Sequence, residues 1–230
     1  MYKEELRNKI KKLGVDLCGF GSVERMNSAP EGFKPRDVLP ESKTVISFAI
    51  AFPAGTLKST SPHPYTRIRN SISDKLNGIS LDVCLLLEKE GFLAVPIPVI
   101  EDVFDEKTGR YRSIISIKHA AQAAGVGTIG RNSLLITPEY GSLVWLGAVL
   151  TDYDIETDPL LEDLCTNCDL CVKACPVNAL EKEELDQKKC RDCCFGEAGG
   201  IWAIKCHACR DVCPKLLGEK RNQKLSGITL

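Results

Sequence analysis

Four cysteines stand close together in the last third of the chain, and their spacing is typical of an iron–sulfur ligand run. Cys165, Cys168, Cys171 and Cys175 follow one another as C-x2-C-x2-C-x3-C, and Pro176 comes directly after the last of them. This is the bacterial-ferredoxin pattern for a 4Fe–4S cluster. Its short steps wrap the backbone around the cluster, and N–H groups that point at the sulfurs help to set the potential. The pattern therefore predicts one-electron redox chemistry.

A second set of cysteines supplies thiolates for another cluster. Cys190 is followed by the run C-x2-C-x3-C-P, which begins at Cys206. In two-cluster ferredoxins the cysteine before the proline ligates the other cluster. We therefore assign two crossed ligand sets. The first cluster takes Cys165, Cys168, Cys171 and Cys213, and the second takes Cys175, Cys190, Cys206 and Cys209.

Other readings of these cysteines stay open. Cys193 and Cys194 are alternatives to Cys190, because the three lie together in Cys-Arg-Asp-Cys-Cys. Paired C-x2-C units also make zinc sites, although the first run is unusual for one. Disulfides are disfavoured, because the charged N-terminus lacks the apolar core of a signal peptide and unexported thiols stay reduced. We expect Cys18 and Cys84, which stand in apolar stretches, to pack in the core.

The cysteine distribution and the overall composition indicate how the chain is divided into domains and which partners it lacks. Ten of the twelve cysteines fall after residue 160, which predicts a first domain over residues 1–155 and a second over 156–230. The net charge of −1 gives no nucleic-acid footprint, so we expect no nucleic-acid partner. The longest apolar runs are too short to span a bilayer, so we expect a cytoplasmic protein without a membrane partner.

The first two-thirds of the chain alternates between helical and extended patterns. Apolar spacing predicts helices over residues 2–13, 69–90 and 117–124. Strands are predicted over residues 15–20, 42–52, 92–98, 134–137 and 143–151, and a proline-rich loop over 27–40. Alternation of this kind predicts the α/β class, with helices packed on one central sheet.

A glycine-rich segment matches the letters of a dinucleotide-binding fingerprint. Gly125, Gly127 and Gly130 are spaced as G-x-G-x-x-G. The fingerprint requires a strand before the glycines and a helix after them, and here the predicted order is reversed. Nicotinamide binding is therefore disfavoured. The glycines instead suit a tight turn or a close approach of the backbone to another group.

Two segments and the cysteine runs together carry a family resemblance. The run Gly-Val-Gly-Thr-Ile-Gly-Arg-Asn-Ser-Leu-Leu-Ile begins at Gly125, and Gly-Ser-Leu-Val-Trp-Leu-Gly-Ala-Val-Leu-Thr begins at Gly141. With the crossed cysteine order, they resemble epoxyqueuosine reductase, a cobalamin-dependent iron–sulfur family related to the reductive dehalogenases. The resemblance extends over residues 14–214.

The resemblance implies both a fold and a cofactor. It implies a nitroreductase-like α/β sandwich that holds base-off cobalamin, followed by a two-cluster ferredoxin-like domain that feeds electrons to the cobalt. On this basis the glycines would let backbone approach the corrin, and three residues after them would hydrogen-bond its side-chain amides or a phosphate. The candidate cofactor-binding residues are Gly125, Gly127, Gly130, Arg131, Asn132 and Ser133.

The sequence also departs from the family pattern. The family carries a C-terminal helical-repeat region implicated in tRNA contact, whereas this sequence ends 17 residues after Cys213. The family's acidic proton donor would fall near Tyr111, which is not an acid. Since the related dehalogenases are thought to use a tyrosine, the resemblance implies Tyr111 as the candidate catalytic residue.

Three functions are carried forward from the sequence. The first is an iron–sulfur protein that passes single electrons through two clusters to a corrinoid and, if it is an enzyme, reduces a small substrate. The second is a non-catalytic electron carrier or reductive activator for a partner redox protein. The third is a flavin-linked reductase. Each would need an external electron donor such as a ferredoxin or flavodoxin.

Overall fold

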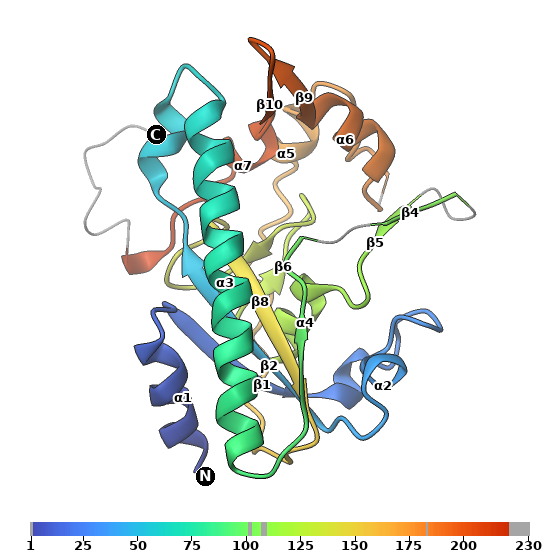
Figure 1. Ribbon diagram of the computed structural model, residues 1–230. Coiled ribbons are helices and arrows are strands. Elements are labelled where there is room, and N and C mark those ends of the chain that lie inside the picture. The colour runs from blue at the N-terminus through green and yellow to red at the C-terminus, as the bar shows by residue number, and fades with distance from the viewer. Residues whose placement is uncertain (1, 101–102, 107–109, 183, 221–230) are drawn as a thin grey trace.

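The computed structural model describes residues 2–100, 103–106, 110–182 and 184–220. Its centre is a sheet with the strand order β1-β2-β8-β3, in which each neighbouring pair is antiparallel. The strands are β1 (Leu17–Ser22), β2 (Thr44–Ala51), β3 (Ala94–Ile97) and β8 (Val144–Thr151). Figure 1 shows the long helix α3 (His63–Lys89) lying along this sheet.

Helices cover both faces of the sheet, as the sequence predicts. Side chains of β2 alternate between the faces, so Ile46 and Phe48 join a core cluster with α3 and α1 (Lys3–Lys12). Val45 points the other way and packs in a second cluster with α4 (Ile117–Ala123). Because both faces are buried, β2 reads as a nearly continuous apolar run. The structure confirms the layered arrangement of helices on a sheet.

Helix α3 begins at His63, earlier than the residue 69 predicted from apolar spacing. Pro62 is the N-cap residue and Pro64 lies in the first turn, where a missing N–H costs no helical hydrogen bond. The helix ends before Gly91, whose φ of +86° suits a glycine after a helix.

Several short elements were not predicted. The expected proline-rich loop contains α2 (Pro35–Val38) and is preceded by η1 (Val23–Met26), and η2 (Ala54–Lys58) follows β2. Two hairpins pair β4 (Val103–Asp105) with β5 (Arg110–Arg112) and β6 (Thr128–Ile129) with β7 (Leu135–Ile136). The strand expected over residues 134–137 is therefore β7, which lies outside the central sheet.

The cysteine-rich part consists of short elements grouped near the N-terminal end of α3 (Figure 1). They are α5 (Leu170–Lys173), α6 (Gln187–Cys194), β9 (Phe195–Ala198), β10 (Ile201–Ile204) and α7 (Ala208–Asp211). Ile204 and Leu216 belong to the same core cluster as α3, and the N–H of Ile204 donates to Thr66 Oγ1 at 2.9 Å. The two parts thus share a core, and a division at residues 155 and 156 remains a prediction.

Candidate functional site

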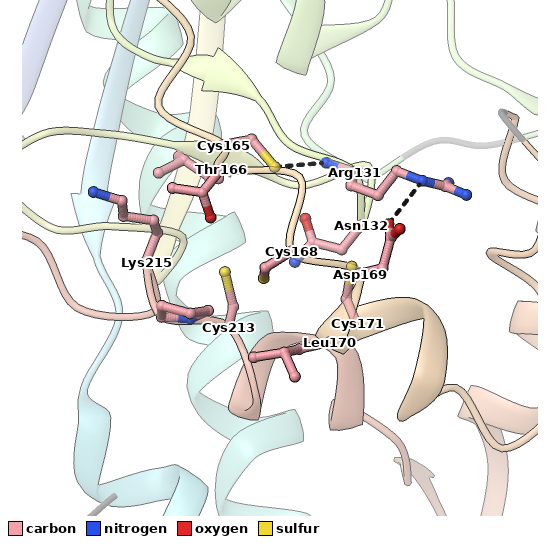
Figure 2. A pocket seen from close by; sticks show the side chains of 12 residues that line it. Arg131, Asn132, Cys165, Thr166, Cys168, Asp169, Leu170, Cys171, Cys213 and Lys215 are labelled. Carbon is pink, nitrogen blue, oxygen red and sulfur yellow. Dashed lines mark hydrogen bonds and ion pairs between the residues drawn. The ribbon is translucent and has the colours of Figure 1, made fainter.

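The first group of cysteines lines a small cavity bordered by α5 and by the segment that follows α7. The two helices pack together. Cys171 lies on α5, and Cys213 follows α7. Figure 2 shows their thiols beside those of Cys165 and Cys168. The loop that brings them together bends at Asn167 and Asp169, which have φ values of +51° and +56°. Asparagine and aspartate tolerate this left-handed conformation better than most residues do.

The electrostatics of this group agree with close thiol neighbours. Burial raises the pKa of the Cys171 thiol, and the thiols of Cys213 and Cys165 raise it further. Burial also raises the pKa of the Cys213 thiol, and the nearby thiols of Cys165 and Cys168 raise it further. Thiolates that would repel one another in the metal-free chain are the ligands that an iron cluster needs.

Backbone N–H groups point at two sulfur atoms of the first cysteine run, one from each assigned ligand set. The N–H of Arg131 donates to Cys165 Sγ at 3.4 Å, a contact drawn in Figure 2. The N–H of Ala179 donates to Cys175 Sγ at 3.2 Å. Hydrogen bonds of this kind raise the reduction potential of a cluster, because they stabilise the additional negative charge.

The second group gathers around α6 and the segment before α7. Burial raises the pKa of Cys190 to about 11, and the thiols of Cys194, Cys175, Cys206 and Cys193 act in the same direction. Burial raises the pKa of Cys209 to about 12, with Cys190 as the next largest cause. Cys171 also raises the pKa of Cys209, so the two groups adjoin.

The structure bears on the choice among the three cysteines of α6. Cys190 has electrostatic contact with all three of its assigned co-ligands: Cys175, Cys206 and Cys209. The thiol of Cys194 instead donates to the backbone oxygen of Cys206 at 3.1 Å. Cys193 lies beside Cys206 and Cys175. This arrangement favours Cys190 and leaves its ligand role a proposal.

No three histidine, cysteine or carboxylate side chains within the described ranges converge on a point where a single metal ion would be held. A 4Fe–4S cluster is a larger body, and its four cysteines bind separate iron atoms around it. The two groups of thiols therefore suit clusters rather than single metal ions.

A cleft of about 850 Å³ adjoins the second cysteine group. Its walls come from α4, β5, α6 and the turn over residues 130–133. Cys190 lies in the wall, and so do four of the predicted site residues: Tyr111, Gly130, Arg131 and Ser133. A cleft of this size is within the range of small-molecule and cofactor sites.

Tyr111 is held in the cleft wall by contacts from α6. Its N–H donates to Gln187 Oε1 at 2.7 Å, and the guanidinium carbon of Arg191 lies 3.8 Å from the centre of its ring. Phe104 packs at 4.9 Å between ring centres. These contacts fix the ring beside the segment that carries Cys190.

The predicted glycines lie close to other segments of the chain. A side-chain carbon on Gly125 would lie 2.3 Å from the backbone oxygen of Pro159, and one on Gly127 would lie 2.3 Å from that of Ile136. A carbon on Gly130 would lie 2.8 Å from the Ile136 side chain. The glycines thus allow the chain to approach itself closely, and of the three only Gly130 lines the cleft.

The residues after these glycines connect the cleft with the cysteines. Arg131 lines both the cleft and the first thiol cavity. Its side chain donates to the backbone oxygen of Lys182 at 3.0 Å and lies 3.6 Å from Asp169. Asn132 is buried and donates to the backbone oxygen of Cys209 at 3.2 Å, so it faces the cysteines rather than the cleft.

Lys118 is a cleft residue that the sequence did not indicate. Its amine donates to the backbone oxygen of Ser133 at 3.2 Å and contacts the Ser133 hydroxyl. Burial, with a smaller effect from Arg110, lowers the pKa of this amine. A single lysine in an alanine-rich helix gives no sequence signal, because only the fold turns it into the cleft.

Positive charge predominates among the described residues of the cleft wall. Its arginines and lysine are Arg25, Arg110, Arg112, Lys118, Arg131 and Arg191. The carboxylate among them is Glu184, which is paired with Arg110. Such a wall suits a ligand that carries anionic groups.

Comparisons with known proteins agree with the cysteine pattern and the fold. Residues 159–181 match the 4Fe-4S binding domain family. Epoxyqueuosine reductase of Bacillus cereus is 28% identical over 94% of this chain, and that of Listeria monocytogenes is 31% identical over 82%. The chain spans 65% and 55% of these relatives, respectively.

Solved structures extend the agreement to the whole fold. A crystal structure of epoxyqueuosine reductase aligns with a TM-score of 0.67 and 22% identity, covering 92% of this chain and 64% of that one. A reductive dehalogenase, whose structure suggests a mechanism for B12-dependent dehalogenation, aligns with a TM-score of 0.68 and 18% identity. That match covers 97% of this chain and 33% of the dehalogenase.

The resemblance found in the sequence is thus confirmed. The chain is a homologue of the epoxyqueuosine reductases, with the fold of those enzymes and of the reductive dehalogenases and with a ferredoxin-like 4Fe-4S binding domain. These relationships imply iron–sulfur redox chemistry. Among the described helices, none is both long and apolar enough to cross a bilayer.

Proposed function

We propose that this protein is an iron–sulfur reductase with two 4Fe–4S clusters and a cleft that binds a corrinoid and the substrate. The observation that carries this proposal is the position of Cys190, which belongs to the second cysteine group and lies in the cleft wall. A cluster bound by Cys190 would lie next to a cavity of cofactor size.

The order of the two clusters follows from exposure. Cys168 of the first group is exposed, whereas Cys190 of the second borders the cleft. Cys171 lies near enough to Cys209 to raise the pKa of its thiol, so the two groups are neighbours. Electrons from an external ferredoxin or flavodoxin would therefore enter at the first cluster and leave from the second.

The residues of the cleft fit a corrinoid in size and in charge. The cleft offers about 850 Å³ and a wall rich in cations, which suits the phosphodiester of cobalamin. Lys118, Ser133 and Gln122 would hold its polar edge. When bound, a corrinoid supplies the reducing metal centre, while the protein orients the substrate and excludes water. Tyr111 would hold the proton that the reduced substrate takes up.

A modified nucleoside in RNA is the substrate class that two observations favour. The cations of the cleft wall suit a phosphate backbone. One structural relative is an epoxyqueuosine reductase solved with an epoxyqueuosine-modified tRNA stem loop. This weighs against the expectation, based on net charge, of no nucleic-acid partner. RNA binding with a strong salt dependence would support this class, and its absence would favour a small free substrate.

The test of the cofactor is a pair of titrations on anaerobically prepared, iron-loaded protein. Cobalamin and flavin are added separately, and binding is followed by absorbance. We expect saturable binding of one cobalamin, weakened in Lys118→Met and unchanged in Lys12→Met, an exposed site on α1. Binding of flavin instead would favour the flavin-linked reductase. If neither binds, the electron-carrier alternative replaces this proposal.

A further inference from the structure

Arg210 is a buried cation between two of the assigned cluster ligands. It lies on α7, directly after Cys209 and three residues before Cys213, and it is only 5% exposed. Its Nη1 donates to the hydroxyl of Tyr65 on α3 at 3.0 Å. Its guanidinium carbon lies 5.8 Å from the ring centre of Trp145.

The partners of this guanidinium are neutral groups. Across the described parts of the chain, no carboxylate lies within ion-pair distance of Arg210. The adjacent Asp211 accepts instead from His207 Nδ1 at 2.6 Å. A phenol and an indole ring stabilise a cation only in part, and a buried charge is costly unless an opposite charge accompanies it. Arg210 therefore requires an anion from another source.

The available source of negative charge is the thiolate sulfur around it. Arg210 directly follows Cys209 on α7, and the N–H of Cys213 donates to the backbone oxygen of Arg210 at 3.1 Å. The buried guanidinium is therefore held within the chain segment that carries two of the assigned ligands. Tyr65, which accepts the hydrogen bond from Arg210, also lies near Cys194 and Cys209, so the cation is held beside the second thiol group.

We propose that Arg210 is the buried counter-charge of the iron–sulfur clusters and that it raises the reduction potential of the second cluster. This inference rests on the clusters of the proposed function. When an external one-electron donor reduces a cluster, the cluster gains one negative charge and the donor is oxidised. No bond breaks in this step. A fixed positive charge nearby stabilises the reduced state more than the oxidised one.

Tyr65 and Trp145 are the residues that position this charge. Tyr65 is itself fixed between rings, with Phe52 at 4.8 Å and His207 stacked at 5.0 Å between centres. His207 stands between the ligands Cys206 and Cys209. The hydroxyl of Tyr65 thus anchors Arg210 to α3 while the ring supports the ligand loop. Arg210 acts through charge, and Tyr65 acts through position.

The test is a redox titration of the iron-loaded protein followed by paramagnetic resonance. Removal of the charge in Arg210→Met is expected to lower the midpoint potential of the second cluster by about 59 mV, which is a tenfold change for a one-electron couple. Arg210→Lys keeps the charge and should restore most of the shift. Tyr65→Phe should give a smaller shift. Lys188→Met removes an exposed charge on α6 and should give none.

The outcomes separate this inference from the proposed function. Loss of cluster in Arg210→Met but not in Arg210→Lys would also support a charge requirement. Unchanged midpoint potentials in Arg210→Met, or equal effects of the Met and Lys variants, would overturn the inference. A wild-type protein that holds no iron after reconstitution would overturn the proposed function as well.

Discussion

Asp158 fixes the segment that leads from the sheet to the cysteines, and its neutralisation gives a sharp test of how the two parts are held. Its carboxylate lies 2.8 Å from Arg7 Nη2 and 2.8 Å from Lys3 Nζ, both on α1. It also accepts from the N–H of Phe20 on β1 at 2.9 Å. Asp158→Asn keeps the shape and removes the charge. We therefore expect the anchoring of residues 155–163 to weaken while the fold persists.

The magnitude follows from the contacts that lose their charge. Hydrogen bonds that involve charged groups contribute about 1.5–3 kcal/mol each. The Asp158 side chain is 18% exposed, so solvent screens the interaction only in part. An asparagine retains an acceptor for the N–H of Phe20 and for one of the cations. We expect the free energy of unfolding to fall by about 2–3 kcal/mol.

The pH dependence of the free energy of unfolding is a second, independent test of the role of Asp158. Burial alone would raise the pKa of Asp158, but hydrogen bonds from Arg7, Lys3 and the N–H of Phe20 lower it below 3.8 overall. The unfolded chain therefore takes up this proton at a higher pH than the folded chain does. The stability contributed by the carboxylate is present above about pH 4 and is lost as the pH falls through the folded pKa.

The assay is urea unfolding of the iron-loaded protein without oxygen, at pH 7 and at decreasing pH. Glu5→Gln is the matched control, because Glu5 pairs with Lys9 on the exposed side of the same helix. The reasoning is refuted if Asp158→Asn is no less stable than Glu5→Gln at pH 7. It is also refuted if the difference between wild type and Asp158→Asn grows on acidification.

Three further predictions concern the cysteines and the cleft. Cys213→Ala should lose about half of the iron and disturb the paramagnetic signal of the other cluster, because each cysteine run supplies ligands to both clusters. Full iron content in this variant would exclude the crossed assignment. Tyr111→Phe should slow substrate reduction about 10²-fold with unchanged cobalamin affinity, and an unchanged rate would exclude it as proton donor. Burial raises the pKa of Cys84 from 9.0 to about 12. Between these two values, the stability contributed by the Cys84 thiol should fall by up to about 1.4 kcal/mol per pH unit, because the unfolded chain loses the proton first. The difference in free energy of unfolding between wild type and Cys84→Ala, measured with urea, should therefore shrink as the pH rises. A constant difference would contradict this.

The sheet and its helices were accessible from sequence because burial leaves a periodic pattern. β2 and β8 are apolar runs, and α3 carries apolar residues such as Leu76 and Val83 at helical spacing. Strands β4, β5 and β6 were not predicted, because strands of two or three residues are too short to show a period. Strand β7 was predicted, but its pairing with β6 outside the central sheet was not. The start of α3 was not predicted, because two nearby prolines are typical of a loop. Only the structure shows that they occupy the N-cap and the first turn of a helix.

The cysteine runs could be predicted from the sequence because the spacing of cluster ligands is local. The cleft could not be predicted, because it is assembled from distant segments. Tyr111, Lys118 and Cys190 meet only through the packing of β5, α4 and α6. Gly125 and Gly127 were expected beside a cofactor, and their neighbours are Pro159 and Ile136. A glycine in sequence indicates a close approach, but it does not identify what approaches. Arg210 gave no signal either, because its burial depends on α3.

The central claim is that this chain holds two 4Fe–4S clusters, and the most direct measurement is its metal content combined with paramagnetic resonance. Protein prepared without oxygen is analysed for iron, sulfide and zinc, and spectra are recorded before and after dithionite. The account predicts about eight irons per chain and the spectra of two interacting reduced clusters. Colourless, zinc-loaded protein that remains silent after dithionite would contradict it.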